Sequence, residues 1–125
     1  MSGSTWTGLP APSLGLAWLL LAFAIVFEIG GTVCMRLSQG FTNWMPSVLI
    51  FVFYACSFAL NTMVVRTLDL SVTYAVWSGV GTLATAIIGI YCFKEPATAL
   101  KLASIGLIVV GVLGLHTASR LQSGA

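Results

Sequence analysis

Glu28 is the residue whose position points most directly to chemistry. It lies in the apolar segment AIVFEIGGTVCMR, residues 24–36, and no charged side chain precedes it in the chain. A charge at the centre of a bilayer costs about 2.5–3.5 kcal/mol on insertion scales, so such residues usually face a cavity and mark an ion or proton path. Because one carboxyl group can hold a proton or a cation but not both, Glu28 is a candidate proton- and substrate-binding residue of an exchanger.

The residues that follow Glu28 suit a cavity. Gly31 and Thr32 are three and four positions further on, which puts them one helical turn away on the same side. Gly31 removes side-chain bulk, and Thr32 offers a hydroxyl. The alternative is a Glu28 that pairs with a buried base. Apart from Lys101 at the start of the last apolar segment, no Lys or Arg occurs inside these segments. A buried base for Glu28 would then come from another chain, and the protein would be an accessory subunit.

A later apolar segment carries four residues that form a stripe along one face of the predicted helix. Tyr74, Trp77, Ser78 and Gly81 have the spacing i, i+3, i+4 and i+7, which is one face of a helix. Aromatic faces attract organic cations, by about 2 kcal/mol when both groups are desolvated. Tyr54 is a candidate third ring from another segment. The alternative interpretation of these aromatic residues is ordinary contact with the core or with lipid.

Gly79 and Gly81 interrupt the same segment. Glycine inside a helix costs about 1 kcal/mol relative to alanine. We therefore predict a helix bend, or kink, at this pair. The alternative is that the two glycines allow close packing against Gly30 and Gly31.

The composition indicates an integral membrane protein that consists of helices. The chain is 58% hydrophobic and 6% charged, whereas soluble domains carry about 25% charged residues. Four apolar segments reach the length of about 20 residues that a spanning helix needs. Their approximate bounds are 16–35, 44–65, 70–92 and 99–117. They do not alternate apolar and polar residues as barrel strands do, so the predicted fold class is an all-α membrane protein.

The predicted organisation is one transmembrane domain with two tails. The domain covers residues 14–119. Residues 1–13, rich in Gly, Ser, Thr and Pro, are a predicted flexible tail, and residues 120–125 form a second one. The spacing of cysteine and histidine gives no metal site. Nothing in the sequence indicates a cofactor, an enzyme active site or a nucleic-acid partner, so the expected partners are protons, a cation and the lipid bilayer.

The basic residues give almost no signal for orientation. Four spans put both termini on one side with Arg66 and Arg120, while Arg36, Lys94 and Lys101 lie on the other. Orientation follows the bias of Lys and Arg between the two sides. Two against three predicts either a weak preference or a protein that inserts both ways.

Four helices enclose little space, so we expect an oligomer. Ser104, Gly111 and Gly114 fall near one face of the last predicted helix, where small residues let helix backbones approach each other in lipid. We predict a dimer interface at Ser104 and Gly111. The alternative is packing inside one subunit.

Taken together, the residues resemble the small multidrug resistance (SMR) transporters from about Leu16 to Ser119. The resemblance rests on the segment FEIGGTVCMRLSQGFT around Glu28, Pro46-Ser47, Tyr54, SVTYAVWSGVG at 71–81 and a glycine-containing last span. It implies antiparallel, dual-topology dimers of four-helix subunits in the bacterial inner membrane. Such dimers export organic cations in exchange for protons by alternating access. A homodimer is expected, with a heterodimer as the alternative.

The resemblance also implies roles for individual residues. Glu28 of both subunits would bind proton or substrate in competition. The pocket would be lined by Tyr74 and Trp77, with Ser78 as a polar neighbour, Gly31 and Thr32 beside the acid and Tyr54 as an accessory residue. The helix kink would be at Gly79 and Gly81, and the dimer stripe at Ser104 and Gly111. Ser104 departs from the glycine usual at its position.

The branch of the family is predicted from the pocket. Guanidinium exporters typically carry Trp where this chain has Gly31, and favour Thr where it has Ser78. Both differences favour export of quaternary ammonium or other hydrophobic cations. In contrast, the segment FKEPATALK at 93–101 is similar to the guanidinium branch, and LDLSVTYAVW at 68–77 to polyamine exporters that work as heterodimers.

Overall fold

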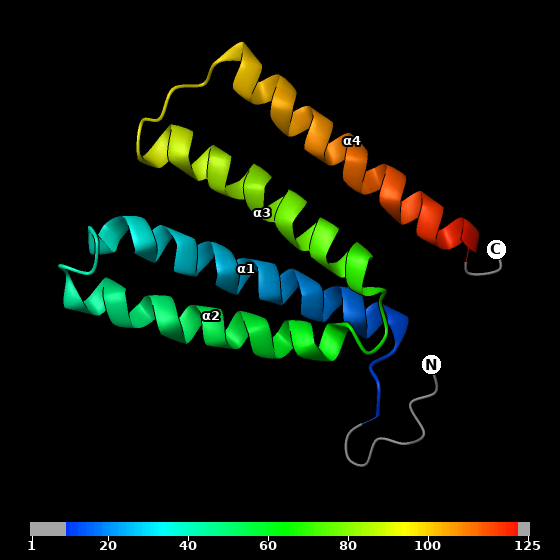
Figure 1. The fold of residues 1–125 in the computed structure, drawn as a ribbon. Helices are drawn as coiled ribbons and strands as arrows, with labels where there is room; N and C mark the ends of the chain where they lie inside the picture. The colour runs from blue at the N-terminus through cyan, green and yellow to red at the C-terminus, as the bar shows by residue number, and fades with distance from the viewer. Residues whose placement is uncertain (1–9, 123–125) are drawn as a thin grey trace.

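The computed structural model describes residues 10–122 of the chain, and these form four helices joined by short loops (Figure 1). The helices are α1 (Leu14–Ser38), α2 (Trp44–Val64), α3 (Leu70–Cys92) and α4 (Ala99–Gln122). Each is long and apolar enough to cross a membrane. The predicted all-α fold with four spans is therefore confirmed.

Two helices extend beyond the predicted spans. α1 continues to Ser38 and α4 to Gln122, because polar residues at a membrane surface do not end a helix. α4 thus enters the segment predicted as a C-terminal tail. The rest of that tail, 123–125, and residues 1–9 of the predicted N-terminal tail lie outside the described residues.

The ends of α1 have clear local causes. The Ser13 side chain accepts a hydrogen bond from the Leu16 amide at 3.3 Å, which caps the first turn. At the other end, Gln39, Gly40 and Phe41 have φ values of 50°, 70° and 67°, so the chain reverses within a left-handed turn. This reversal makes α1 and α2 a tight antiparallel pair.

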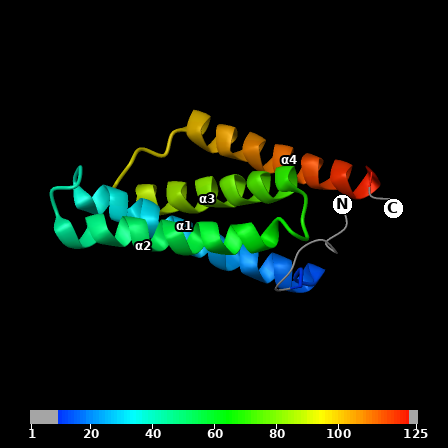
Figure 2. The same ribbon diagram turned by 60° about the horizontal axis from the view of Figure 1, so that its bottom comes forward.

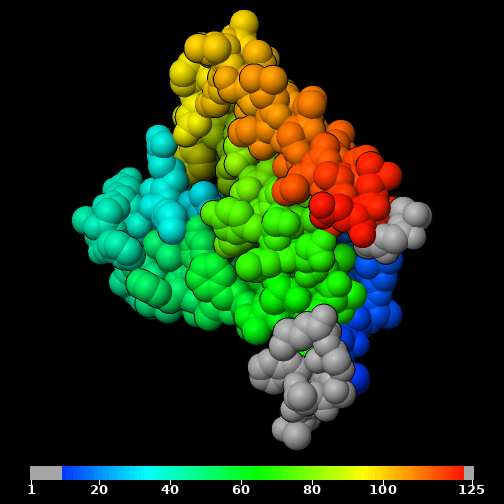
Figure 3. Space-filling model, turned by 45° about the vertical axis from the view of Figure 1, so that its right-hand side comes forward, coloured from blue at the N-terminus to red at the C-terminus, as the bar shows by residue number. Residues whose placement is uncertain are grey.

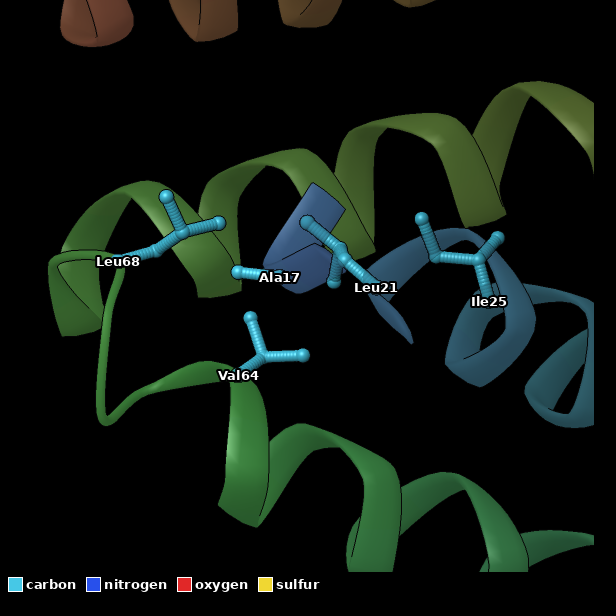
Figure 4. Close-up of a cluster of buried hydrophobic side chains, with 5 residues drawn as sticks. All are labelled: Ala17, Leu21, Ile25, Val64 and Leu68. Carbon is cyan, nitrogen blue, oxygen red and sulfur yellow. The ribbon is translucent and has the colours of Figure 1, made fainter. Parts of the chain in front are cut away.

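The four helices are packed unequally. α1 packs along α2 and also contacts α3, whereas α4 lies against α3 on the side away from α2 (Figures 1 and 2). No residue of α4 is buried, and the helix forms a ridge on the outside of the subunit (Figure 3). The buried apolar cluster is near the α2–α3 loop and consists of Ala17, Leu21, Ile25, Val64 and Leu68 (Figure 4).

The glycines of α3 lie at helix contacts. The helix runs without interruption through Gly79 and Gly81, so the bend stays a prediction. A Cβ on Gly79 would lie 2.7 Å from Val112 Cγ2 of α4, and one on Gly81 would lie 3.1 Å from Glu28 Oε2. These glycines therefore bring α3 close to α4 and to Glu28, and not to Gly30-Gly31 as the packing alternative supposed.

The two predicted interface residues of α4 have different surroundings. A Cβ on Gly111 would meet nothing within 4 Å, so this position is free to contact another chain. Ser104 lines a cavity that also borders α1 and α3. The dimer interface at Ser104 and Gly111 stays a prediction.

Candidate functional site

The side chains of Thr32 and Tyr54 form a hydrogen-bonded series that holds one carboxyl oxygen of Glu28. Thr32 Oγ1 lies 3.0 Å from Glu28 Oε1 and 3.0 Å from the main-chain oxygen of the same residue. The Tyr54 hydroxyl lies 2.8 Å from Thr32 Oγ1. When Tyr54 donates to Thr32, the Thr32 proton is free to bond Oε1. The carboxyl group is therefore oriented by one side chain of α1, Thr32, and one of α2, Tyr54.

Gly31 makes this arrangement possible. A Cβ at position 31 would lie 2.7 Å from Cε2 of the Tyr54 ring, so any side chain there would push the ring away from α1. The ring must lie this close for its hydroxyl to reach Thr32. Gly31 therefore acts on Glu28 indirectly, through the position of Tyr54.

Removing the Tyr54 hydroxyl tests this support. In Tyr54→Phe the ring keeps its place but Thr32 loses a partner, and a net hydrogen bond contributes about 1 kcal/mol. We expect cation affinity to fall by roughly three- to tenfold, as measured by isothermal titration calorimetry. Gly31→Leu displaces the whole ring and should lower affinity further. Equal affinity in Tyr54→Phe and the unmodified protein would contradict a role for the hydroxyl.

The other carboxyl oxygen of Glu28, Oε2, has no hydrogen-bond partner among residues 10–122. It is buried and lies against the bare backbone at Gly81. Buried polar groups in proteins are nearly always paired, so an unpaired one needs a reason. A carboxyl oxygen in this state can take a proton or associate with a cation.

A cavity of about 240 Å³ lies beside Glu28, between α1 and α3. Its lining residues are Glu28, Thr32, Tyr74, Trp77, Ser78, Gly81, Thr82 and Thr85. The structure thus brings the predicted stripe of α3 and the predicted acid of α1 to one space. Tyr54 and Gly31 are not in the lining; they lie behind Thr32 and support it.

Aromatic rings form a continuous wall next to this cavity. The Tyr74 and Trp77 ring centroids are 5.7 Å apart in an edge-to-face arrangement. Phe58 contacts Trp77 at 6.0 Å and Tyr54 at 5.9 Å. Of these four rings, those of Tyr74 and Trp77 line the cavity and are available to a cation near the Glu28 carboxyl group. Phe58 and Tyr54 pack behind them.

Three contributors to the site were missed in the sequence. Thr82 and Thr85 line the cavity, and Phe58 joins the ring of Tyr54 to that of Trp77. Thr85 could have been found by continuing the α3 stripe for one more turn, since it is four residues after Gly81. Phe58 carries no such signal, because α2 has apolar residues on most of its surface.

Comparisons with known proteins identify the family of this chain. The family model described as Small Multidrug Resistance protein matches residues 16–108. An uncharacterised membrane protein, YvaE of Bacillus subtilis (strain 168), is 44% identical over 99 residues, which cover 79% of this chain and 83% of that protein.

Two further relatives have functional names. The multidrug resistance protein EbrA of Bacillus atrophaeus is 38% identical over 101 residues, 81% of this chain and 96% of EbrA. A guanidinium exporter of Yersinia pseudotuberculosis is 36% identical over 104 residues, 83% of this chain and 100% of the exporter. Since the family model covers most of the chain and these relatives match nearly end to end, the chain belongs to the small multidrug resistance family of multi-pass membrane transporters and is not an enzyme.

Proposed function

We propose that this transporter is a proton-coupled antiporter for hydrophobic organic cations of the quaternary ammonium or phosphonium type. A proton and a cation compete for Glu28, and the protein alternates between two access states. The observation that carries the proposal is the unpaired, buried Oε2 of Glu28 beside a cavity. A cation that takes this position expels the proton, and a proton expels the cation, so the two movements are coupled.

The aromatic part of the cavity wall favours a hydrophobic organic cation. The Tyr74 and Trp77 rings lie in the lining together with the Glu28 carboxyl group, and aromatic faces attract organic cations. The hydroxyl groups of the lining, on Thr32, Ser78, Thr82 and Thr85, can in addition bind a cation that donates hydrogen bonds. Gly31 lies outside this lining, and the Tyr54 ring occupies the space that a side chain at position 31 would fill. The Tyr54 hydroxyl supports the carboxyl group through Thr32.

We further propose that the working unit is an antiparallel homodimer, with a heterodimer as the alternative. The cavity of one subunit is bounded by α1 and α3 and is open to the outside. Gly111 and Gly114 of α4 have empty space where a Cβ would lie, so a second helix can approach closely there. The near balance of basic residues on the two sides supports insertion in both orientations.

Export of guanidinium is the second candidate. The relatives named guanidinium exporters and those named multidrug resistance proteins match this chain at similar identity. A guanidinium group also contacts an aromatic ring at the surface of this structure, since the Arg36 side chain lies over the Phe93 ring at 5.1 Å. A polyamine is a third possible substrate.

Substrate-evoked currents separate these candidates. The purified protein would be reconstituted in liposomes and exposed to tetraphenylphosphonium, guanidinium and spermidine in turn. We expect current with tetraphenylphosphonium and little with the other two. Current with guanidinium alone would overturn the hydrophobic-cation proposal in favour of the second candidate. Silence with all three would indicate a missing partner chain and favour an accessory subunit.

A further inference from the structure

A larger cavity adjoins the one beside Glu28. It has a volume of about 410 Å³ and lies between α1, α3 and α4. The two cavities share Thr32, Thr82 and Thr85 in their linings. These three threonine side chains therefore lie at the junction between the Glu28 cavity and the larger cavity.

A second carboxylate borders the larger cavity, and it already holds cations. Glu95 Oε1 lies 3.4 Å from Lys101 Nζ, and Glu95 Oε2 lies 3.6 Å from Arg36 Nη1. The guanidinium carbon of Arg36 lies 5.1 Å from the centre of the Phe93 ring. The Glu95 amide donates to the Gly89 carbonyl oxygen at 3.0 Å, and this bond fixes the turn that presents the carboxylate.

The chemistry of this arrangement repeats that of the Glu28 site. In both places a carboxyl group lies near an aromatic face, and this combination recognises organic cations. At Glu95 the position is filled by a cation of the chain itself. The Arg36 side chain is more than half exposed, at 59%, so its guanidinium can leave for water without being stranded in an apolar environment.

We propose that Glu95 and Phe93 form an outer cation-binding site, and that a guanidinium-headed organic cation occupies it by displacing Arg36 as it passes to or from Glu28. The passage to Glu28 rests on the second candidate of the proposed function, export of guanidinium-type cations, whereas occupancy of the outer site does not. The apolar wall of the larger cavity includes Val33, Ile105 and Ile108, and it accommodates the rest of such a molecule.

Displacement of Arg36 fits the charges around Glu95 better than the binding of a further cation beside Arg36 and Lys101. Arg36 and Lys101 around one carboxylate already leave a net charge of +1, so a third cation would be repelled. Exchange with Arg36 keeps the charge constant, while Lys101 continues to hold Oε1. A tethered group competes at an effective concentration in the millimolar range, so Arg36 should keep external cations weakly bound in the unmodified protein.

Binding of phenylguanidinium, followed by isothermal titration calorimetry, tests the outer site with the Glu28 site disabled. In Glu28→Gln we expect weak binding, because Arg36 competes. In Glu28→Gln/Arg36→Gln the affinity should rise by at least about tenfold, since the tethered competitor is gone. Adding Glu95→Gln to this double variant should abolish the gain. Lys94→Gln, which changes the neighbouring charge, serves as the matched control and should leave the gain intact.

The calorimetry results either support or overturn the outer site. No gain on removal of Arg36, or a gain that survives Glu95→Gln, would overturn the outer site, provided that circular dichroism shows each variant to be as helical as its parent. The proposed function is tested separately by substrate-induced proton release from the chain with Glu28 intact. Loss of that release with outer binding preserved would overturn the antiport proposal and leave the outer site standing.

Discussion

Glu28→Gln should abolish both cation binding and substrate-induced proton release. The glutamine side chain has nearly the same shape and can still accept a hydrogen bond from Thr32, so the helices should stay packed. It carries no charge and exchanges no proton, however, and both halves of the coupling disappear together. Isothermal titration calorimetry would measure the binding of tetraphenylphosphonium, and a pH indicator in weakly buffered solution would measure the released protons.

The pH dependence sharpens this test. In the unmodified protein, cation affinity should increase as pH rises, because the proton that competes for Glu28 is withdrawn. Glu28→Asp keeps the charge but moves it by one methylene group away from Thr32, so binding should weaken and remain pH-dependent. Full transport by Glu28→Gln, or binding that it retains with an unchanged pH profile, would show that another group carries the exchange.

Gly81→Val should have the second largest effect. A Cβ at position 81 would lie 3.1 Å from Glu28 Oε2, and the two further methyl groups of valine would fill the space beside the unpaired oxygen. Overpacking of this kind costs about 1–3 kcal/mol, which corresponds to roughly a 5- to 150-fold loss of cation affinity if the whole cost falls on the bound state. Tetraphenylphosphonium binding would be measured by calorimetry as for Glu28→Gln.

Gly106→Val is the matched control for Gly81→Val. A Cβ at Gly106 would meet nothing within 4 Å, so the same change in α4 should leave cation affinity within about twofold of the unmodified protein. Thermal unfolding followed by circular dichroism would separate a blocked site from a damaged fold. Equal loss of affinity in both variants would mean that any added bulk in these helices disturbs the protein, and that Gly81 has no special place beside Glu28.

A single subunit explains only part of a transport cycle. Its largest buried cluster is near the α2–α3 loop, while α4 has no buried residue. Much of the apolar surface of α4 is therefore left for lipid or for another chain. The antiparallel second copy proposed above would cover part of this surface.

The two signals for the branch of the family come from different parts of the protein, the residues near Glu28 and the segment 93–101. Gly31 and Tyr54 meet directly, so these two positions cannot be read one at a time. A large residue at position 31 would require a smaller one at position 54. In contrast, the 93–101 segment, which resembles guanidinium exporters, borders the larger cavity through Phe93, Glu95 and Lys101. The two signals in the sequence thus belong to two different places in the molecule.

Much of this protein was determined by the sequence alone, because it depends on local periodicity. The lengths of the four apolar segments predicted the four spanning helices, and a spacing of four residues put Thr32 beside Glu28 in one helix. The stripe of Tyr74, Trp77 and Ser78 follows from the same helical repeat. These relations require only that the segments are helical, and an apolar segment in lipid has little choice, since its backbone polar groups must bond within the segment.

The tertiary structure decided which helix faces pack against each other. That Tyr54 reaches Thr32 across 22 positions, that Gly81 lies against Glu28, and that Glu95 takes Arg36 as a partner all depend on how the helices are placed side by side. Helices with apolar residues all around give no signal for which face turns inward. Periodicity places Gly31 and Gly81 on one face of their own helices, but it does not show that Tyr54 packs at the first and Glu28 at the second. These close approaches complete the site.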